Sequence, residues 1–309
     1  MDMRFGPTTE DGAFRKASRC LRDCFGVVLL LGLLSGCEPA SSDNQNSKPS
    51  SAATNSGPTV SSSTTGSSAT MLEIPAGRFV MGDPDEVDAA PHEVNISAFY
   101  LDKYLVTQDQ FQTLMHDNPS RWKGGNNPVE QVRWSDAVRF CNKRSEAEGL
   151  KPCYDLQTWK CDFDADGYRL PTEAEFEYAC RAGTGTPYLS GNTSAKLGDF
   201  AWFEKNSGGH PHAIGQKQPN AWGLYDMCGN LWEWCNDFYQ VDYYASAARQ
   251  DPKGPLEGKT KVVRGGSWRA PAENCRPGYR YNENPGSADV CFGYDIYGFR
   301  CARKMAGKR

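Results

Sequence analysis

The second half of the chain limits the possible folds more than any other feature. About 120 residues after Arg181 are rich in Gly, Asn, Trp and Tyr, and their apolar positions have no helical period. Irregular segments of this length inside a folded domain need ions, disulfides or buried aromatic side chains to hold them. All 8 Trp of the chain lie beyond Met71, so aromatic side chains are available for this purpose. We therefore expect a single loop-rich domain.

The N-terminus has the pattern of an export signal. Basic residues between Arg15 and Arg22 precede an apolar run over residues 25–34, which is typical of a signal peptide and too short for a membrane span. The run ends in Leu-Ser-Gly-Cys37, which resembles the bacterial lipobox, in which the cysteine is lipidated. A plain secretory signal with a chance cysteine is the alternative. We predict a signal peptide over 1–37 and lipidation at Cys37.

The leader also predicts where the protein resides. A lipidated, exported chain is anchored in the bacterial cell envelope, and several acyl chains hold a protein firmly on a membrane. Glu38 follows the cysteine, and in the enterobacterial sorting rule this residue does not retain a lipoprotein at the inner membrane. We expect anchoring at the outer membrane, facing the periplasm or the cell surface. Membrane contact is expected only through the lipid anchor.

Composition divides the remaining chain into a linker and a domain. Residues 38–70 are mostly Ser, Thr, Asn, Gly, Ala and Pro, which bury no core, so we predict a disordered tether. The folded domain is expected over 71–305. Its partner is not a nucleic acid, because the net charge is −4 and the basic residues are scattered rather than gathered on one face.

Local patterns predict a few regular elements. Two short strands around a turn are expected within 72–81, and another strand over 94–100. Three helices have start signals of the capping type. They are predicted after Thr107 (108–115, with Gln110), after Ser135 (136–148, ended by Gly149) and after Thr172 (173–181, with Glu175).

Cysteine, histidine and aspartate patterns suggest local sites. Nine cysteines follow Cys37, so at least one stays free or pairs elsewhere, and Cys153 and Cys161 flank a short loop that would allow a local disulfide. His210 and His212 form a His-Pro-His pair, for which a loop role is favoured over metal binding. Residues 162–173 have the spacing of an EF-hand calcium loop, but Arg169 and Pro171 interrupt it. An acidic turn before a helix is the favoured interpretation.

Six segments share the pattern of one family. In chain order they are IPAGRFVMGD (74–83), NPVEQVRWSDAVRFC (127–141), GYRLPTEAEFEYACR (167–181), NAWGLYDMCGNLWEW (220–234), RGGSW (264–268) and GFRC (298–301). Together they resemble the formylglycine-generating enzyme, or sulfatase-modifying factor, family. The resemblance implies an irregular α+β fold related to C-type lectins, with little regular secondary structure.

The resemblance also implies an activity that one residue calls into question. Established members oxidise a cysteine of a sulfatase to formylglycine with copper(I) and oxygen, and two cysteine thiolates hold the copper. In this chain the corresponding positions are Ala270 and Cys275, which leaves Cys275 and Ser267 as the candidate catalytic residues. One thiolate does not complete a two-thiolate copper site. Cys228 and Cys291 are additional cysteines from which a relocated pair with Cys275 could form.

Two further features are carried by the resemblance. The family links the cysteine of the third segment to that of the last, which implies a disulfide between Cys180 and Cys301. It also binds calcium through a loop that corresponds to residues 226–233. The implied ligands are the side chains of Asp226 and Glu233 and the backbone carbonyls of Gly229 and Leu231; solvated acids beside core tryptophans are the alternative.

Three functions remain open from the sequence. The protein is an oxidase active despite Ala270, a family enzyme with a different oxidative chemistry, or a non-catalytic binding or accessory module on a lectin-like scaffold. The first implies a sulfatase as partner, and the last a protein, peptide or glycan ligand.

Overall fold

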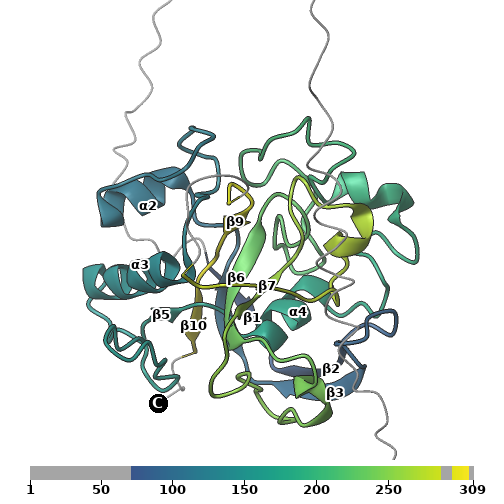
Figure 1. Ribbon diagram of the computed structural model, residues 1–309, viewed down its shortest axis with the longest axis horizontal. Coiled ribbons are helices and arrows are strands. Elements are labelled where there is room, and N and C mark those ends of the chain that lie inside the picture. Colours follow the sequence, from purple (N-terminus) through teal and green to yellow (C-terminus); the bar gives the residue numbers. More distant parts are fainter. Residues whose placement is uncertain (1–70, 287–293, 306–309) are drawn as a thin grey trace, which may run out of the picture. The chain divides into compact units, whose positions relative to one another are not determined.

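The structure is a computed structural model that describes residues 71–286 and 294–305 (Figure 1). The predicted signal peptide, linker and lipidation site at Cys37 lie outside these residues. Among the described residues, no helix combines the length and the apolarity needed to cross a membrane.

Short strands form three small sheets within the described residues. The strands are β1 (Met71–Ile74), β2 (Gly77–Met81), β3 (His92–Ile96), β4 (Phe99–Asp102), β5 (Tyr168–Arg169), β6 (Trp232–Phe238), β7 (Lys261–Arg264), β8 (Tyr281–Glu283), β9 (Tyr297–Gly298) and β10 (Ala302–Lys304). The sheet orders are β1-β4-β10-β5, β2-β3 and β8-β7-β6-β9. Figure 1 shows β6 and β7 in the middle of the domain.

The two strands predicted within 72–81 are present as β1 and β2, whereas the third predicted strand is wrong. β1 and β2 do not pair around their turn, because β1 pairs with β4 while β2 pairs with β3. The predicted strand over 94–100 is two strands, β3 and β4, that belong to different sheets. Buried residues alternate along β3, whereas β4 buries Phe99, Leu101 and Asp102, and this difference reflects its central place in its sheet.

Helices begin largely where their capping residues predict. α2 (Gln108–Met115) and α4 (Glu173–Arg181) follow Thr107 and Thr172, and both have the complete capping box. α3 (Trp134–Ala147) begins earlier than predicted, because Asp136 accepts a hydrogen bond from the backbone N–H of Arg133 and Ser135 lies inside the helix. After α4, the helices among the described residues are all short 3-10 helices: η2 (Ser194–Asp199), η3 (Tyr243–Ala245) and η4 (Ala272–Cys275).

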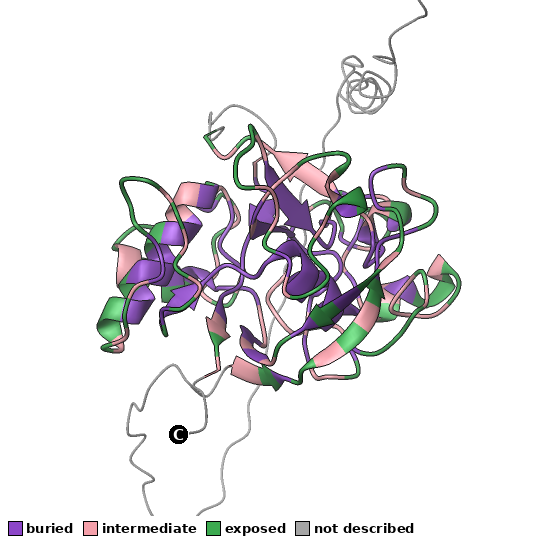
Figure 2. Cartoon of the chain, turned by 90° about the horizontal axis from the view of Figure 1, so that it is seen from below, coloured by how far each residue is buried: buried purple, intermediate pink, exposed green. Residues whose placement is uncertain are grey.

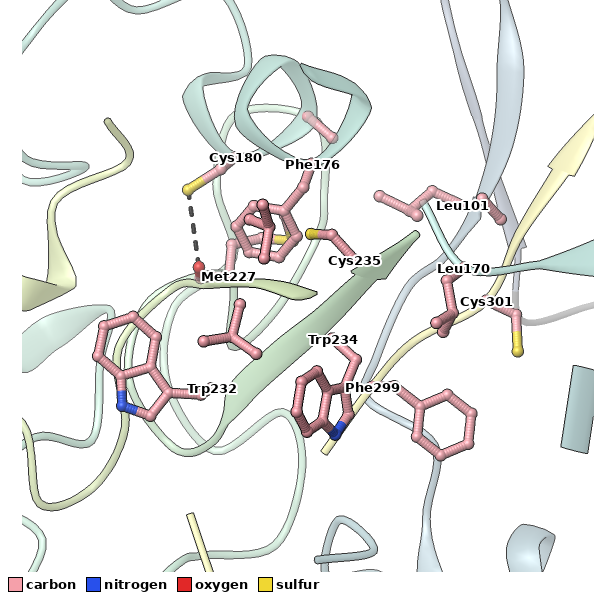
Figure 3. Packing of buried hydrophobic residues seen from close by; sticks show 14 of the residues in the cluster. Leu101, Leu170, Phe176, Cys180, Met227, Trp232, Trp234, Cys235, Phe299 and Cys301 are labelled. Atoms are coloured by element: carbon pink, nitrogen blue, oxygen red, sulfur yellow. Dashed lines mark hydrogen bonds between the residues drawn. The ribbon is translucent and has the colours of Figure 1, made fainter. Parts of the chain in front are cut away.

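Aromatic side chains make up much of the core, as the tryptophan content predicted. Trp134, Trp232 and Trp234 lie in one large apolar cluster, part of which appears in Figure 3. Leu105, Leu231 and Trp268 form a smaller second cluster. Figure 2 shows buried residues through the centre of the domain and exposed residues mainly along loops and outer helix faces.

Buried arginines tie the irregular segments to this core. Arg264, Arg280 and Arg300 are among the largest fully buried side chains that the structure describes. Each α4 glutamate is paired with an arginine from elsewhere in the chain. The pairs are Glu173 with Arg280, Glu175 with Arg169, and Glu177 with Arg264. A buried charge requires such a partner, so the alternating glutamates of α4 define which loops pack against it.

We expect these pairs to be sensitive to the loss of one partner. The Glu173 carboxylate accepts hydrogen bonds from Arg280 at 2.7 and 3.0 Å, and both side chains are buried. Arg280→Met should lower the free energy of unfolding by about 3–5 kcal/mol, because it leaves a buried carboxylate without its main partner. Urea denaturation measures this change.

A matched pair and a double variant test the cause. Arg78→Met breaks an exposed pair with Glu93 and should change stability by less than about 1 kcal/mol. Adding Glu173→Gln to Arg280→Met should recover part of the loss. An Arg280→Met variant as stable as Arg78→Met would contradict this role of the pair.

Candidate functional site

The turn after β7 is packed against the one remaining cysteine of the expected copper pair. Gly265 and Gly266 have φ values of +91° and +80°, a conformation that side chains other than glycine rarely adopt. A Cβ atom on Gly266 would lie 2.6 Å from the Sγ of Cys275, so the thiol occupies the space that the glycine leaves. The turn and η4 therefore form one tightly packed unit.

Neither candidate catalytic residue is presented to solvent. Cys275 and Ser267 are both buried, and the backbone N–H of Arg269 donates to the Ser267 hydroxyl at 3.4 Å. Burial raises the pKa of the Cys275 thiol to about 12. Because the thiolate is the form that binds metals and attacks electrophiles, this cysteine has the properties of a core residue. The Ala270 methyl is also buried and offers no donor.

Two other thiols lie close to Cys275. The sulfur of Cys180 is 3.6 Å from that of Cys228, and both side chains are buried. The hydrogen bond with Cys180, together with burial, raises the pKa of Cys228, and the charge of Cys275 adds to the rise. Of the two cysteines that could form a relocated pair with Cys275, Cys228 is therefore close enough to interact with it, and Cys180 lies beside Cys228. Cys291 lies outside the described residues.

The implied disulfides differ from the observed arrangement. Cys180 and Cys301 are not bonded, and Figure 3 shows them well apart, with β6 between them. The sulfur of Cys301 lies instead 3.7 Å from that of Cys141. The Cys180–Cys301 pairing is therefore corrected: Cys180 lies beside Cys228, whereas Cys301 lies beside Cys141.

The local disulfide is also absent. Cys153 and Cys161 are close in the fold, since Cys161 bridges to Tyr154, but both thiols are free.

The implied calcium loop gathers its two carboxylates in the core. Asp226 and Glu233 are both buried, and burial raises the pKa of each. One oxygen of Asp226, Oδ1, has no hydrogen-bond partner, whereas Oδ2 accepts from the backbone of Gly215. Both oxygens of Glu233 accept from Arg300 at 2.7 Å. Asp226 thus has an oxygen that a cation would satisfy, while Glu233 is already paired.

The other acidic and histidine motifs have structural partners. Asp162 pairs with Lys151, Asp164 pairs with Lys304, and Glu173 lies in the ion pairs of α4, so the 162–173 run is an acidic turn. The ring of His212 stacks on Trp202 at 3.7 Å. Among the described residues, no group of three or more His, Cys, Asp or Glu side chains is arranged to hold a metal ion.

Sequence reasoning missed a pair of buried carboxylates beside the 264–268 segment. Asp295 accepts a hydrogen bond from the indole of Trp122 at 3.1 Å, and its backbone carbonyl accepts one from Trp268 at 3.0 Å. Glu130 accepts from the backbone N–H of Trp122 at 2.8 Å, while its second oxygen is buried without a partner. Glu130 lies within the 127–141 segment and Asp295 lies just before the 298–301 segment. An acid close to apolar residues was the sole sequence feature that could have indicated a buried carboxylate.

The charge of Asp295 acts on the pKa of Glu130. Burial is the main reason that the pKa of Glu130 rises from 4.5 to about 7, and the negative charge of Asp295 contributes. Hydrogen bonds from the Trp122 and Arg121 backbones and the charge of Lys123 oppose the rise. Glu130 is therefore a buried acid that changes its charge near neutral pH.

A separate hollow of about 460 Å³ opens between β2 and the end of α4. Its walls include the aromatic rings of Phe79, Tyr178 and Trp222, and none of the candidate catalytic or calcium residues lines it.

Comparison with known proteins identifies the scaffold. Residues 57–305 match the sulfatase-modifying factor enzyme 1-like domain. The chain belongs to this family. The formylglycine-generating enzyme of Thermomonospora curvata is 28% identical, over 75% of this chain and 92% of that protein. The predicted family and its irregular α+β fold are confirmed.

Other relatives of the sulfatase-modifying factor domain have different names. The chaperone protein LppX of Paenibacillus barcinonensis is 34% identical, over 57% of this chain and 71% of that protein. The serine/threonine-protein kinase pkn1 of Chlamydia pneumoniae is 31% identical over 76% of this chain, which spans only 38% of pkn1. The solved structure of Treponema denticola variable protein 1 has a TM-score of 0.71 and 35% identity, and the match covers 76% of this chain and 95% of that one.

The buried Glu130 predicts a pH-dependent stability for this domain. The folded-state pKa of Glu130, about 7, lies above its ordinary value of 4.5, so the folded state binds a proton more tightly than the unfolded state does. The contribution of this proton to the free energy of unfolding is fully present below pH 4.5 and is lost as the pH rises through 7. In the wild type, the free energy of unfolding should therefore fall by up to about 3 kcal/mol between these pH values, and Glu130→Gln should abolish this part of the decrease. Urea denaturation at several pH values between these limits measures it.

Two comparisons make the measurement specific. Asp237, whose pKa is raised to about 8 mainly by burial, should leave a remaining pH dependence in Glu130→Gln. Glu146→Gln, at an exposed ion pair, should follow the wild type. A Glu130→Gln profile parallel to that of the wild type would show that this acid does not titrate as expected.

Proposed function

We propose that this protein is a binding or accessory module on the sulfatase-modifying factor scaffold, and that it does not oxidise protein cysteines with copper. The observation that carries the proposal is the state of the two expected ligand positions. Ala270 has no donor atom, and the Cys275 thiol is buried against Gly266. The module would be presented on the lipid anchor that the leader sequence predicts at Cys37.

The donor set does not fit copper(I) as the family holds it. Two thiolates are needed, and the thiols of Cys180 and Cys228, which interact with Cys275 electrostatically, are themselves fully buried. Burial raises the pKa of Cys275 and Cys228, which disfavours their thiolates. No step of the proposed function therefore passes through copper.

The relatives support a role in binding. LppX is named as a chaperone protein, the name of Treponema denticola variable protein 1 states no oxidase activity, and both are more than 30% identical to this chain. We infer a related non-catalytic role here, with a protein, peptide or glycan as the ligand.

We also propose a structural calcium ion at the loop from Asp226 to Glu233. Its support is the unpartnered Oδ1 of Asp226, and an oxygen-rich loop is the kind of site that calcium prefers. Asp226, with φ of +53°, would be the main side-chain ligand. Glu233 would contribute while still bonded to Arg300. The ion would fix a loop that has little regular structure.

An oxidation assay tests the main proposal. The full chain is incubated with copper(I), oxygen and a peptide containing Cys-x-Pro-x-Arg, and the peptide aldehyde is sought by mass spectrometry. We expect no aldehyde above a protein-free control, while the Thermomonospora curvata enzyme in the same buffer converts the peptide. Aldehyde formed by this chain, and lost in Cys275→Ser, would overturn the proposal.

Chelation tests the calcium ion. EDTA should lower the thermal midpoint of the wild type, because an ion that binds only the folded state stabilises it. Added calcium should restore the midpoint. Asp226→Ala should melt earlier and show no response to EDTA. A wild-type midpoint that is the same with and without EDTA would contradict a structural ion.

A further inference from the structure

We propose that Arg121 and Arg269 form a binding site for a carboxylate attached to a ring or other flat apolar group. The site would be the ligand-recognition surface of the binding module, and to that extent the inference rests on the proposed function. Nothing in the site uses Cys275 or the calcium loop.

One buried carboxylate holds both arginines. Arg121 lies 3.3 Å from Oδ2 of Asp295, and Arg269 lies 3.5 Å from Oδ1. The Asp295 side chain is only 2% exposed, whereas those of Arg121 and Arg269 are 61% and 51% exposed. The buried Asp295 carboxylate thus holds both guanidinium groups, while the arginine side chains stay accessible to solvent.

Tryptophan rings fix the direction of the two arginines. The guanidinium of Arg121 lies over Trp122 at 5.0 Å, and that of Arg269 lies over Trp268 at 4.4 Å. The two indoles meet edge to face at 6.2 Å, and each donates a hydrogen bond to Asp295. Stacking of this kind restricts an arginine side chain that would otherwise be mobile.

Buried groups also hold the backbone of this loop. Glu130 accepts from the N–H of Trp122, and the amide of Gln108 donates to the carbonyl of Trp122 at 2.9 Å. The backbone of Trp122, next to Arg121, is therefore held by the buried side chains of Glu130 and Gln108. A surface ordered before binding loses less entropy when a ligand arrives.

The charge of the site favours an anion. Below pH 7, where Glu130 is neutral, Asp295 contributes one negative charge against two guanidinium groups, so the arrangement has an excess positive charge. Each guanidinium has five N–H donors in a planar fork that matches a carboxylate. The single bond from Arg121 to Asp295 and the long contact from Arg269 use few of these donors.

Neighbouring rings indicate the rest of the ligand. The ring of His210 lies 5.6 Å from Trp122 and 4.4 Å from His212, which stacks on Trp202. Trp122, His210, His212 and Trp202 are all partly exposed. A row of partly exposed rings beside a pair of arginines fits a ligand with a flat apolar body next to its carboxylate.

Calorimetric titration with small probes tests the site. The full chain, solubilised in a nonionic detergent, is titrated with benzoate, acetate and benzamide below the pKa of Glu130. We expect saturable binding of benzoate, weaker binding of acetate, which has no ring, and none of benzamide, which has no charge. Arg121→Gln and Arg269→Gln should each weaken benzoate binding about tenfold, as expected for the loss of one charged hydrogen bond.

Arg139→Gln is the matched control. Arg139 stacks on Trp159 at 5.1 Å and pairs with Asp136, so it has the same chemistry without a second arginine or a buried anchor. It should bind benzoate as the wild type does. Equal affinity in the wild type, Arg121→Gln and Arg269→Gln, or no benzoate binding at low millimolar concentration, would overturn the inference.

The two proposals fail in different ways. Aldehyde formation in the peptide assay would overturn the non-catalytic function and leave benzoate binding by these arginines unchanged. Loss of the arginine effect would remove this site and leave the oxidation result as it stands.

Discussion

The fold depends on carboxylates and arginines that are buried together. The domain has short strands, three small sheets and long irregular segments, so side-chain pairs act together with single backbone hydrogen bonds between distant segments. Glu177 on α4 binds Arg264 at the end of β7, and Glu233 on β6 binds Arg300 in the last family segment. Such pairs add little net stability over apolar substitutes, but a single partner left alone is very unfavourable. They therefore enforce one arrangement of the loops.

This constraint explains why the turn after β7 persists when the copper pair does not. Arg264 is required by Glu177, and Gly265 and Gly266 have positive φ values that bring their backbone against the core. Gly266 is needed because Cys275 occupies the space beside it. Each residue of the Arg-Gly-Gly run thus has a packing role of its own. Its presence is therefore explained by the fold and by itself carries no information about catalysis.

The sequence predicted what local interactions decide and missed what distant ones decide. The boundaries of α2 and α4 follow from Thr107 and Thr172, whose capping boxes involve residues only three positions away. The sheet that contains β1 and β4 also contains β10 from near the end of the described chain, and local patterns do not specify such a distant neighbour. The Cys180–Cys301 link failed for the same reason: a family pattern supplied the partner, and the packing of α4 beside Cys228 did not follow it.

The candidate site was hidden for a related reason. Glu130 and Asp295 are far apart in the sequence, and neither has a motif that marks it as functional. They become informative only when Trp122 is seen to donate its backbone N–H to one acid and its indole N–H to the other. Burying two acids is unfavourable, and a module needing only a stable core would fill this space with apolar side chains. Here the acids order a loop and hold two exposed arginines over two indoles. The buried carboxylates of Glu130 and Asp295 thus support an ordered surface, whereas the described thiols near the family's catalytic position are packed away from solvent.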